Sequence, residues 1–479
     1  MGADLVAPPS FENLVQIEND PAFLEFCCPR TGYLLWPLVR IQFFKQLISD
    51  LFYKQASLLV PASSVPYRKA LTVLPKVLLH NIRQPRVPSE ILVFATGAGQ
   101  FRREGQWFNR ITDYLVESSY ADVATIEGLV DWHLPEPRWN KNVSYWTPWQ
   151  SAILLIGRIC SRDEHVRQAR EILEYARSRA FALYGLSVSD RNMEMLVGVV
   201  SRKIARLPVM QLAYRNILKK FKPRLLLLEE GCYSDHGVLN HVAREMGVRV
   251  AEPQHGMISG GHHSYNYAPL LRESEKYRRY LPHDFLGYGR WWNEQISVPV
   301  EKWVVGHPHY SEQFRSNGCV NAEKRDILLL GDGIEFSLYL SLAKELDSLL
   351  KGRYRVVVRP HPLERVKVYE KYPDGMAGNV AIDRNRDIYE SFGSAYVVAG
   401  EVSTGLFEAA GIVPKVLLWE TSKARFSYPV HPFSGFSDVQ QFAAAILAPE
   451  GGQLSVVQDD IWAPDWRGNY RRYLEQALA

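Results

Sequence analysis

Two stretches of sequence, ILVFATGAG at residues 91–99 and DILLLGDG at residues 326–333, determine the fold class of this chain. Each contains a short apolar run, which predicts a strand buried on both faces, and each continues into a glycine-rich turn. Buried strands that alternate with helices are typical of α/β folds with parallel sheets. We therefore predict two α/β units in tandem, each opening with a strand, a glycine turn and a helix.

Other segments of both units continue this alternation. In the first unit we expect a helix over about 105–117, two or three helices over 150–220, a strand at RLLLLEEG (224–231), a helix over about 237–246 and a strand at VRVAEPQHG (248–256). In the second unit we expect helices over 335–350, 437–448 and 466–478, and strands at YRVVVRPHP (354–362), AYVVAGEVSTGLFEAAG (395–411) and PKVLLW (414–419). The carboxyl ends of parallel strands face one crevice, so polar residues there converge although they are far apart in sequence.

The first 90 residues differ from both units. Segment 33–54, YLLWPLVRIQFFKQLISDLFYK, has aromatic residues and leucines at helical spacing, with Pro37 in or near its first turn. Residues 65–88 are rich in basic residues, namely Arg68, Lys69, Lys76, Arg83 and Arg86. Two interpretations stay open, a helical layer packed on the next domain and a basic, aromatic patch that contacts a membrane surface.

These patterns divide the chain into four parts. We expect a helical region over 1–90, a Rossmann-like unit over 91–300, a linker over 301–325 and a second Rossmann-like unit over 326–479. The last helix of the second unit is expected to pack back on the first unit.

Composition excludes several classes of protein. Lys and Arg number 56 and Asp and Glu 52 among 479 residues, a net charge of +4, which argues against a nucleic-acid binder. An apolar content of 47% with 23% charged residues is ordinary for a globular protein. The five cysteines are scattered and form no CxxC pair, which fits a reducing cytosol better than a disulfide framework. No apolar run is long enough to span a membrane, so we expect a cytoplasmic protein.

The RPHP motif, Arg359 to Pro362, ends one strand of the second unit. An arginine and a histidine at the carboxyl end of a strand can donate hydrogen bonds to a phosphate. The alternative is a turn in which proline stops the strand and His361 is incidental.

The EVSTGLFEAAG motif at 401–411 lies one βα unit further on. Ser403, Thr404 and Gly405 precede a helix, where hydroxyls and free backbone N–H groups bind anions, and Glu408 could hold a ribose hydroxyl. The alternative is an ordinary helix N-cap. We favour the phosphate site because RPHP lies so close in the fold.

Two adjacent carboxylates, Glu229 and Glu230, end an apolar strand of the first unit, and Asp235 follows. Burial and mutual repulsion would raise the pKa of one of them, as a general base that works near neutrality requires. The alternative is a set of ordinary charges near a helix N-terminus.

The segment EPQHGMISGGHHSYNY, 252–267, combines His255 with a glycine-rich loop that carries His262 and His263. The histidine spacing matches no helix-based zinc pattern, so we expect no metal and assign these residues to positioning or stabilising a substrate. Neither glycine turn, at 96–99 or at 331–333, belongs to a GxGxxG motif followed by a ribose-binding acid, which argues against a dinucleotide-binding fold.

Taken together, the tandem units and these motifs resemble GT-B glycosyltransferases. More narrowly, Glu229–Glu230–Gly231, His361–Pro362 and Ser403–Thr404 resemble the three motifs of bacterial sialyltransferases and polysialyltransferases. The QHG and RPHP loops also resemble capsule and O-antigen enzymes, including Kdo transferases and CDP-glycerol glycerophosphotransferases. The resemblance covers about 220–420 and leaves residues 1–90 unexplained.

The resemblance implies a GT-B fold, two Rossmann-like α/β domains facing a cleft, here with an N-terminal helical extension. It implies a nucleotide-activated donor, most simply CMP-linked Kdo or a sialic-acid-like sugar. The donor-binding residues it implies are Gly331, Arg359, His361, Pro362, Ser403, Thr404, Gly405 and Glu408.

On the acceptor side, the resemblance implies that Glu229 or Glu230 is the base, and strand alternation would turn only one of them into the cleft. In a retaining enzyme, Glu229, Glu230 or Asp235 would instead be a nucleophile. His255 would assist from the neighbouring strand.

We therefore expect a metal-independent transferase that acts on a lipid-linked bacterial surface glycan at the inner face of the cytoplasmic membrane. The pair is Glu-Glu with no Asp, and STG loops also occur in enzymes that use UDP- or GDP-sugars, so the base of the nucleotide stays open. Other open alternatives are glycerophosphate transfer from CDP-glycerol, an NDP-sugar 2-epimerase, and a non-catalytic subunit that binds glycan or nucleotide.

Overall fold

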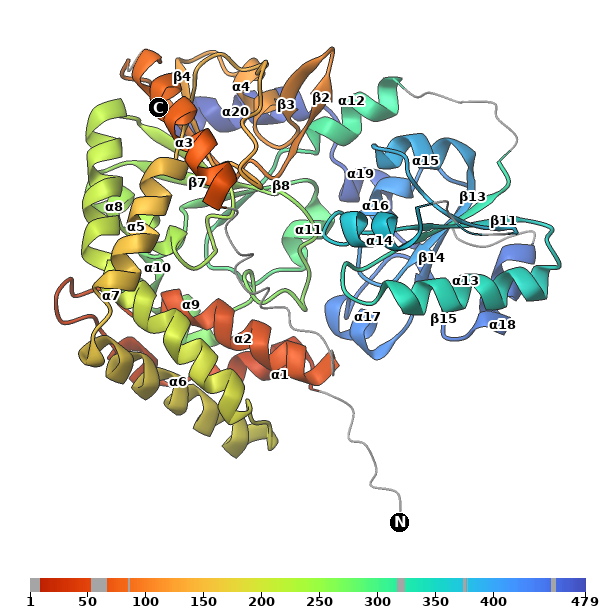
Figure 1. Ribbon diagram of the computed structural model, residues 1–479, viewed down its shortest axis with the longest axis horizontal. Coiled ribbons are helices and arrows are strands. Elements are labelled where there is room, and N and C mark those ends of the chain that lie inside the picture. Colours follow the sequence, from red (N-terminus) through yellow and green to blue (C-terminus); the bar gives the residue numbers. More distant parts are fainter. Residues whose placement is uncertain are drawn as a thin grey trace.

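The computed structural model describes residues 9–52, 67–84, 87–316, 324–373, 376, 378–448 and 454–479. Arg86, Cys319 and residues 317–323 of the expected linker lie outside the described residues. Within them, two α/β units lie side by side, and the N-terminal helices pack on the first unit (Figure 1).

The first unit is built on a seven-stranded sheet in which all pairs of neighbouring strands are parallel. Its order is β5-β4-β1-β6-β7-β8-β9. The strands are β1 (Ile91–Ala95), β4 (Val123–Glu127), β5 (Val143–Tyr145), β6 (Leu225–Leu228), β7 (Arg249–Pro253), β8 (Asp284–Gly287) and β9 (Glu301–Val304). The strand order reverses direction between β1 and β6, so this is the topological switch point of the sheet.

The second unit has a six-stranded parallel sheet of order β12-β11-β10-β13-β14-β15. The strands are β10 (Asp326–Leu330), β11 (Arg355–Arg359), β12 (Val380–Ile382), β13 (Ala395–Gly400), β14 (Lys415–Trp419) and β15 (Ser434–Phe436). Its switch point lies between β10 and β13. The predicted fold class, GT-B with two Rossmann-like units and an N-terminal helical extension, is confirmed by these two sheets.

The helices of the first unit include three, α5 to α7, in the region where we expected two or three. They are α4 (Asp113–Ser118), α5 (Thr147–Ile159), α6 (Asp163–Tyr184), α7 (Asp190–Phe221), α8 (His236–Glu245), α9 (Pro269–Glu273), α10 (Glu275–Arg278) and α11 (Arg290–Glu294). The helices that follow are α12 (Pro308–Ser316), α13 (Phe336–Leu350), α14 (Arg365–Lys371), α15 (Ile388–Ser394), α16 (Thr404–Ala409), α17 (Ser422–Ser427), α18 (Val439–Leu447), α19 (Gln458–Ile461) and α20 (Trp466–Ala477).

The helix predicted over about 105–117 was wrong in its first half. Residues 100–109 form an antiparallel hairpin of β2 (Gln100–Arg103) and β3 (Gln106–Asn109), and α4 begins only at Asp113. Glu104 and Gly105 both have positive φ, 51° and 78°, which is the backbone of a two-residue hairpin turn. A helix cannot pass through two consecutive left-handed residues.

Residues 10–52 pack as an integral layer of the first unit. Helices α1 (Phe11–Leu14) and α2 (Trp36–Phe52) contribute Phe11, Trp36 and Phe44 to the largest apolar core, and Pro37 lies in the first turn of α2. A buried ion pair joins Arg40 of α2 to Glu18. Residues 10–52 therefore form a helical layer packed on the first unit, which is one of the two interpretations of the N-terminal region. Helix α3 (Tyr67–Arg83), in contrast, has one side exposed.

Two sets of contacts hold the units together. Helix α20 returns to the first unit, where Tyr473 donates a hydrogen bond to Asp284. Near the carboxyl ends of the strands, Ser259 of the first unit donates to the carbonyl of Ser427 in α17, and the Phe52 and Phe426 rings lie 4.8 Å apart. The loops at the carboxyl ends of the two sheets therefore face each other. No helix in the described ranges is both long and apolar enough to cross a membrane.

Candidate functional site

The candidate residues gather at the switch points of the two sheets. In the first unit, Thr96 directly follows β1 and Glu229 directly follows β6. In the second unit, Gly331 directly follows β10 and Glu401 directly follows β13. In open parallel sheets ligands bind outside the carboxyl ends of the strands at such points. The motifs therefore occupy the positions where the fold itself leaves a crevice.

Both carboxylate oxygens of Glu229 are hydrogen-bonded to Thr96. Its side chain is buried, Oε2 accepts a hydrogen bond from the Thr96 amide at 2.8 Å, and Oε1 accepts one from the Thr96 hydroxyl at 2.8 Å. Burial raises the pKa of Glu229 from 4.5 to about 7, although the two Thr96 bonds oppose the rise. Glu229 therefore ties the turn after β6 to the glycine turn after β1.

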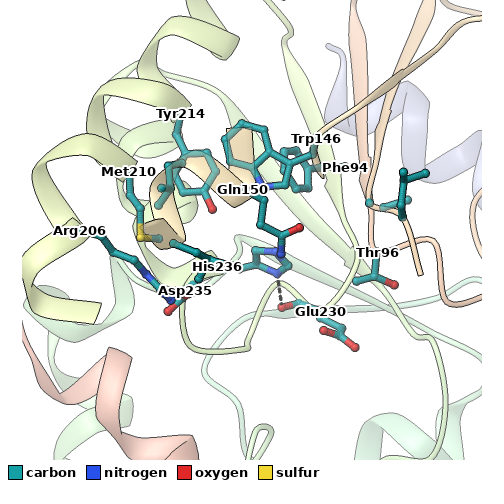
Figure 2. A pocket seen from close by; sticks show the side chains of 15 residues that line it. Phe94, Thr96, Trp146, Gln150, Arg206, Met210, Tyr214, Glu230, Asp235 and His236 are labelled. Carbon is teal, nitrogen blue, oxygen red and sulfur yellow. Dashed lines mark hydrogen bonds and ion pairs between the residues drawn. The ribbon is translucent and has the colours of Figure 1, made fainter. Parts of the chain in front are cut away.

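Glu230 points elsewhere because it lies in a turn and not in the strand. Its φ is 58°, a left-handed conformation that is uncommon for a residue with a side chain. Its carbonyl accepts a hydrogen bond from Nδ1 of His236 at 2.9 Å, and Glu230 is one of the residues that line a pocket (Figure 2). The predicted divergence of the two carboxylates is present, but the turn causes it rather than strand alternation.

The pocket beside Glu230 has a volume of about 320 Å³ and lies between β1, α5, α7 and the start of α8. Its walls combine aromatic rings with polar groups (Figure 2). Trp146 and Tyr214 are stacked with ring centroids 5.5 Å apart. Apolar surface with a few convergent polar groups is the usual lining of a small-molecule site. The main lining side chains are Phe94, Trp146, Gln150, Arg206, Met210, Tyr214, Glu230, Asp235 and His236.

Asp235 is held as a carboxylate by two cations at the edge of this pocket. It pairs with Lys203 at 3.2 Å and with Arg206. Burial alone would raise the pKa of Asp235, but Lys203 and Arg206 outweigh it and hold the pKa below its usual value. A carboxylate that two cations stabilise in this way is a poor proton acceptor.

His255 and Lys45 lie within electrostatic range of Glu230. Burial lowers the pKa of the His255 imidazole, and the charge of Glu230 opposes that effect. Burial likewise lowers the pKa of Lys45, from α2, and Glu230 again opposes it. The structure therefore brings together Glu230, His255 and a lysine from the N-terminal region. Sequence reasoning missed Lys45, whose only signal was a charge within an apolar helix.

The glycine-rich loop after β7 is anchored from the N-terminal region. The Arg40 guanidinium donates to the carbonyls of His263 and Asn266 while Glu18 neutralises it. Burial lowers the pKa of His262 to about 3, so this imidazole is neutral near pH 7. Within the described residues, no group of three His, Cys, Asp or Glu side chains is arranged to hold a metal ion.

In the second unit, His361 lies against the glycine turn after β10. A Cβ added to Gly333 would lie 2.8 Å from Nδ1 of His361, and the φ of Gly333 is 90°, so glycine is required there. The Gly331 amide donates to the carbonyl of Arg359 at 2.9 Å, and Pro362 follows in the turn. Burial lowers the pKa of His361. A neutral imidazole still offers one N–H donor to a ligand.

Arg359 is buried and directs its donors into its own unit. Nη1 donates to Asp383 at 2.5 Å and to Ser391 at 3.1 Å, and Nη2 donates to the carbonyl of Arg386 at 3.3 Å. These contacts hold the loop between β12 and α15 beside β11. The arginine of the RPHP motif thus supports the site from behind His361.

The Ser403–Thr404–Gly405 motif forms the start of α16. Ser403 Oγ accepts a hydrogen bond from the Gly405 amide at 3.1 Å, which is the N-cap that we considered as the alternative. A Cβ on Gly405 would lie 2.8 Å from both Ile388 and Leu330, so only glycine fits. The Thr404 hydroxyl oxygen lies 3.9 Å from the position of a Cβ on Gly256. The STG and QHG loops therefore meet across the interface between the two units.

Glu408 lies one turn further along α16 and is buried. Burial raises its pKa, and Arg110 of the first unit opposes the rise. Glu408 therefore lies close enough to the first unit to interact with a cation there.

A buried ionic cluster fixes the second switch point, and sequence reasoning missed it. Nζ of Lys423 lies 2.5 Å from Asp332, 2.7 Å from Glu401 and 3.3 Å from Glu335. Thr421 donates to the other Glu401 oxygen at 2.6 Å. The only signal was the presence of acids within two residues of the ends of two apolar strands. The cluster ties the glycine turn to α17, which also carries the contact to the first unit.

Comparisons with known proteins describe the architecture alone. No protein-family profile matches the chain, and no curated protein matches its sequence significantly. Among solved structures, the UDP-GlcNAc 2-epimerase from Neisseria meningitidis bound to UDP-GlcNAc is 12% identical, with a TM-score of 0.40 over 82% of this chain and 99% of that one. S. aureus MnaA in complex with UDP is 11% identical, with a TM-score of 0.44 over 81% and 96%. The wall teichoic acid polymerase TagF is 12% identical, with a TM-score of 0.38 over 85% and 92%.

Proposed function

We propose that this chain is a metal-independent glycosyltransferase that moves a Kdo- or sialic-acid-like sugar from a CMP-activated donor to a hydroxyl of a bacterial surface glycan. The observation that carries the proposal is the opposition of two half-sites at the switch points of the sheets. The first unit offers a pocket lined by Glu230, and the second offers Thr404, which faces Gly256 across the interface.

In the binding site for the nucleotide-sugar, the proposal assigns the phosphate to uncharged hydrogen-bond donors of the protein. The N–H of His361, the Thr404 hydroxyl and the backbone N–H groups at the start of α16 would hold the phosphate of the nucleotide. This replaces the divalent cation that other transferases use to neutralise the leaving group. Arg359 would act indirectly, by positioning the strand end that carries His361.

On the acceptor side, the proposal makes Glu230 the general base. Both oxygens of Glu229 already accept hydrogen bonds from Thr96, and Asp235 is paired with two cations, which leaves Glu230 among the three acids. Glu230 would take the proton of the acceptor hydroxyl while that oxygen bonds to the anomeric carbon. The bond from that carbon to the phosphate oxygen breaks at the same time, and CMP leaves with the electron pair.

The size and lining of the pocket support an acceptor sugar as its occupant. The stacked Trp146 and Tyr214 rings supply apolar surface for the C–H face of a sugar ring. Gln150, Arg206 and His236 supply hydrogen-bonding groups around it. Glu230, which is among the residues that line this pocket, would then lie near a hydroxyl group of the bound acceptor sugar.

A thermal-shift comparison of CMP, CDP, UDP and GDP tests the donor. A ligand that binds only the folded state stabilises it by about 2.7 kcal/mol at 100 times Kd, and we expect the largest shift with CMP. Thr404→Ala should weaken this binding on the order of tenfold, because it removes a donor to a charged group. Thr72→Ala, on the outer side of α3, is the matched control and should leave the shift unchanged.

Product analysis separates the alternatives. A CMP-sugar donor that is consumed only with an acceptor, with the phosphate left on CMP, supports the proposal. Phosphorus NMR that finds the phosphate in the polymer would instead indicate glycerophosphate transfer, and a shift confined to UDP or GDP would overturn the choice of CMP. If the folded protein binds none of the four nucleotides, the glycosyltransferase proposal fails.

A further inference from the structure

Helices α3 and α5 form an outward-facing surface next to the pocket, which we call the α3–α5 face. Helix α3 is fixed to the first sheet from its inner side. Nε2 of His80 lies 2.9 Å from the carbonyl of Val143, and Asn81 donates to the carbonyl of Tyr145 at 2.8 Å. Ala70 and Val77 are buried on the same inner side. Helix α5 packs beside α3, so the outer sides of both helices face solvent in the described part of the chain (Figure 1).

The outer side of α3 carries a stripe of apolar residues. Leu71, Pro75, Leu78 and Ile82 follow one another at intervals of four, three and four residues, so they lie on one line along the helix. Leu71 and Ile82 are 73% and 70% exposed. Exposed apolar side chains that gather in this way, and are not scattered singly, mark an interaction surface.

Helix α5 adds to this surface. Trp149, Leu155 and Ile159 are exposed, with Ile159 at 72%. A large aromatic side chain with a polar N–H favours the boundary between water and lipid headgroups.

The charge of the α3–α5 face has a single sign. Lys69, Lys76 and Arg83 are spaced seven residues apart, which places a basic line beside the apolar stripe. Arg68 and Arg158 add further positive charge, and neither helix contains an Asp or Glu residue. An apolar stripe flanked by basic residues is the pattern of a helix that lies in the interface of an anionic membrane.

We infer that the α3–α5 face docks this protein on the surface of an anionic lipid bilayer, without spanning it. A second copy of the chain is a poorer occupant, because a symmetric contact would bring two basic lines together. The lipid headgroups, in contrast, carry the complementary negative charge.

The docked orientation also has a consequence for the acceptor, which rests on the proposed function. Gln150 and Leu154 of α5 line the pocket, and Leu154 is also exposed. The pocket therefore lies beside the docking surface, where an acceptor attached to a membrane lipid would reach it without leaving the bilayer.

Vesicle flotation of the full chain tests the docking. We expect binding to vesicles that contain about one third phosphatidylglycerol in phosphatidylcholine, weak binding to phosphatidylcholine alone, and loss of binding at high salt. Lys69→Glu with Lys76→Glu should weaken binding on the order of a hundredfold. The control with the same charge change is Arg471→Glu with Arg472→Glu on α20.

A second pair of variants tests the apolar contribution. Leu78→Ser with Ile82→Ser should weaken vesicle binding about tenfold or more, because two apolar side chains no longer enter the interface. The control is Leu338→Ser with Leu349→Ser, two exposed leucines of α13. Thermal shifts with nucleotide, measured on the same proteins, report the donor site separately, so failure to dock and failure of the proposed function are distinguishable.

Three results would overturn the inference. The first is equal binding to neutral and anionic vesicles, and the second is an equal loss of binding in the α3 variants and their controls. The third is concentration-dependent self-association that Leu78→Ser with Ile82→Ser abolishes while no vesicle binds, because a second copy would then be the occupant.

Discussion

Replacing Glu229 by glutamine should stabilise this protein at alkaline pH and leave its stability unchanged at acid pH. The amide has the same shape as the carboxylic acid, and its oxygen can still accept the bond from the Thr96 amide. Its NH₂ group can donate to the Thr96 hydroxyl, which then serves as acceptor. The substitution therefore removes the ionisation of Glu229 and little else.

The magnitude and its sign follow from the pKa. Burial raises the pKa of Glu229 from 4.5 to about 7, a difference of about 2.5 units. At 1.36 kcal/mol per unit this is on the order of 3 kcal/mol. Because the folded pKa is the higher one, this stabilisation is fully present below pH 4.5 and is lost as the pH rises through 7. Glutamine has no such proton to lose, so the variant should be more stable by up to about 3 kcal/mol at pH 8.

Chemical denaturation of wild type and variant at pH 4.5, 6 and 8 measures this difference. The two midpoints should coincide at pH 4.5 and separate progressively, with the variant higher at pH 8. Glu12→Gln, which changes an exposed carboxylate of α1, is the control and should follow the wild type. A constant difference across this range, or a variant that is weaker at pH 8, would refute the assignment of a buried, protonated Glu229.

Three further predictions concern the site and its supports. Glu230→Gln should lower kcat on the order of 10² to 10⁴-fold with the fold intact, whereas Glu229→Gln should retain far more activity, as initial rates with a saturating donor would reveal. Ser403→Ala should cost about 1 kcal/mol of stability through loss of the N-cap, and a calorimetric scan measures it. Arg40→Met should destabilise the folded protein by about 3 to 5 kcal/mol, because it leaves the buried Glu18 carboxylate without its cation. Adding Glu18→Gln should restore most of that stability, as chemical denaturation would measure. A double variant as unstable as the single variant would contradict this account.

The sequence predicted the parts of the fold that depend on local patterns. Strands β1, β6, β10 and β13 contain apolar runs that are followed within two residues by glycine or by a charged residue, and both features are visible in the sequence alone. The hairpin at Gln100–Asn109 was missed because its turn is Glu104–Gly105, which lacks the usual Asn or Asp before glycine.

The supports of the site could not be predicted, because they join residues far apart in sequence. Arg40 reaches the carbonyl of Asn266, 226 positions away, and Lys423 reaches Asp332 across 91 positions. A charge inside an apolar helix signals that a partner exists, but a single sequence does not identify it. Sequence reasoning therefore located the motifs at the strand ends and missed the residues that hold them.

The separate roles of the adjacent carboxylates follow from where β6 ends. The Glu229 amide still donates to the carbonyl of Phe94 at 3.0 Å, so Glu229 continues the sheet pairing and its side chain follows the buried direction. Glu230 leaves the ladder in a left-handed conformation that costs on the order of 1 to 2 kcal/mol for a residue other than glycine. Glycine, which is the next residue, would adopt that conformation without strain. This carboxylate is held against the backbone preference at the edge of the pocket, which is the basis of our proposal that Glu230 acts as the general base.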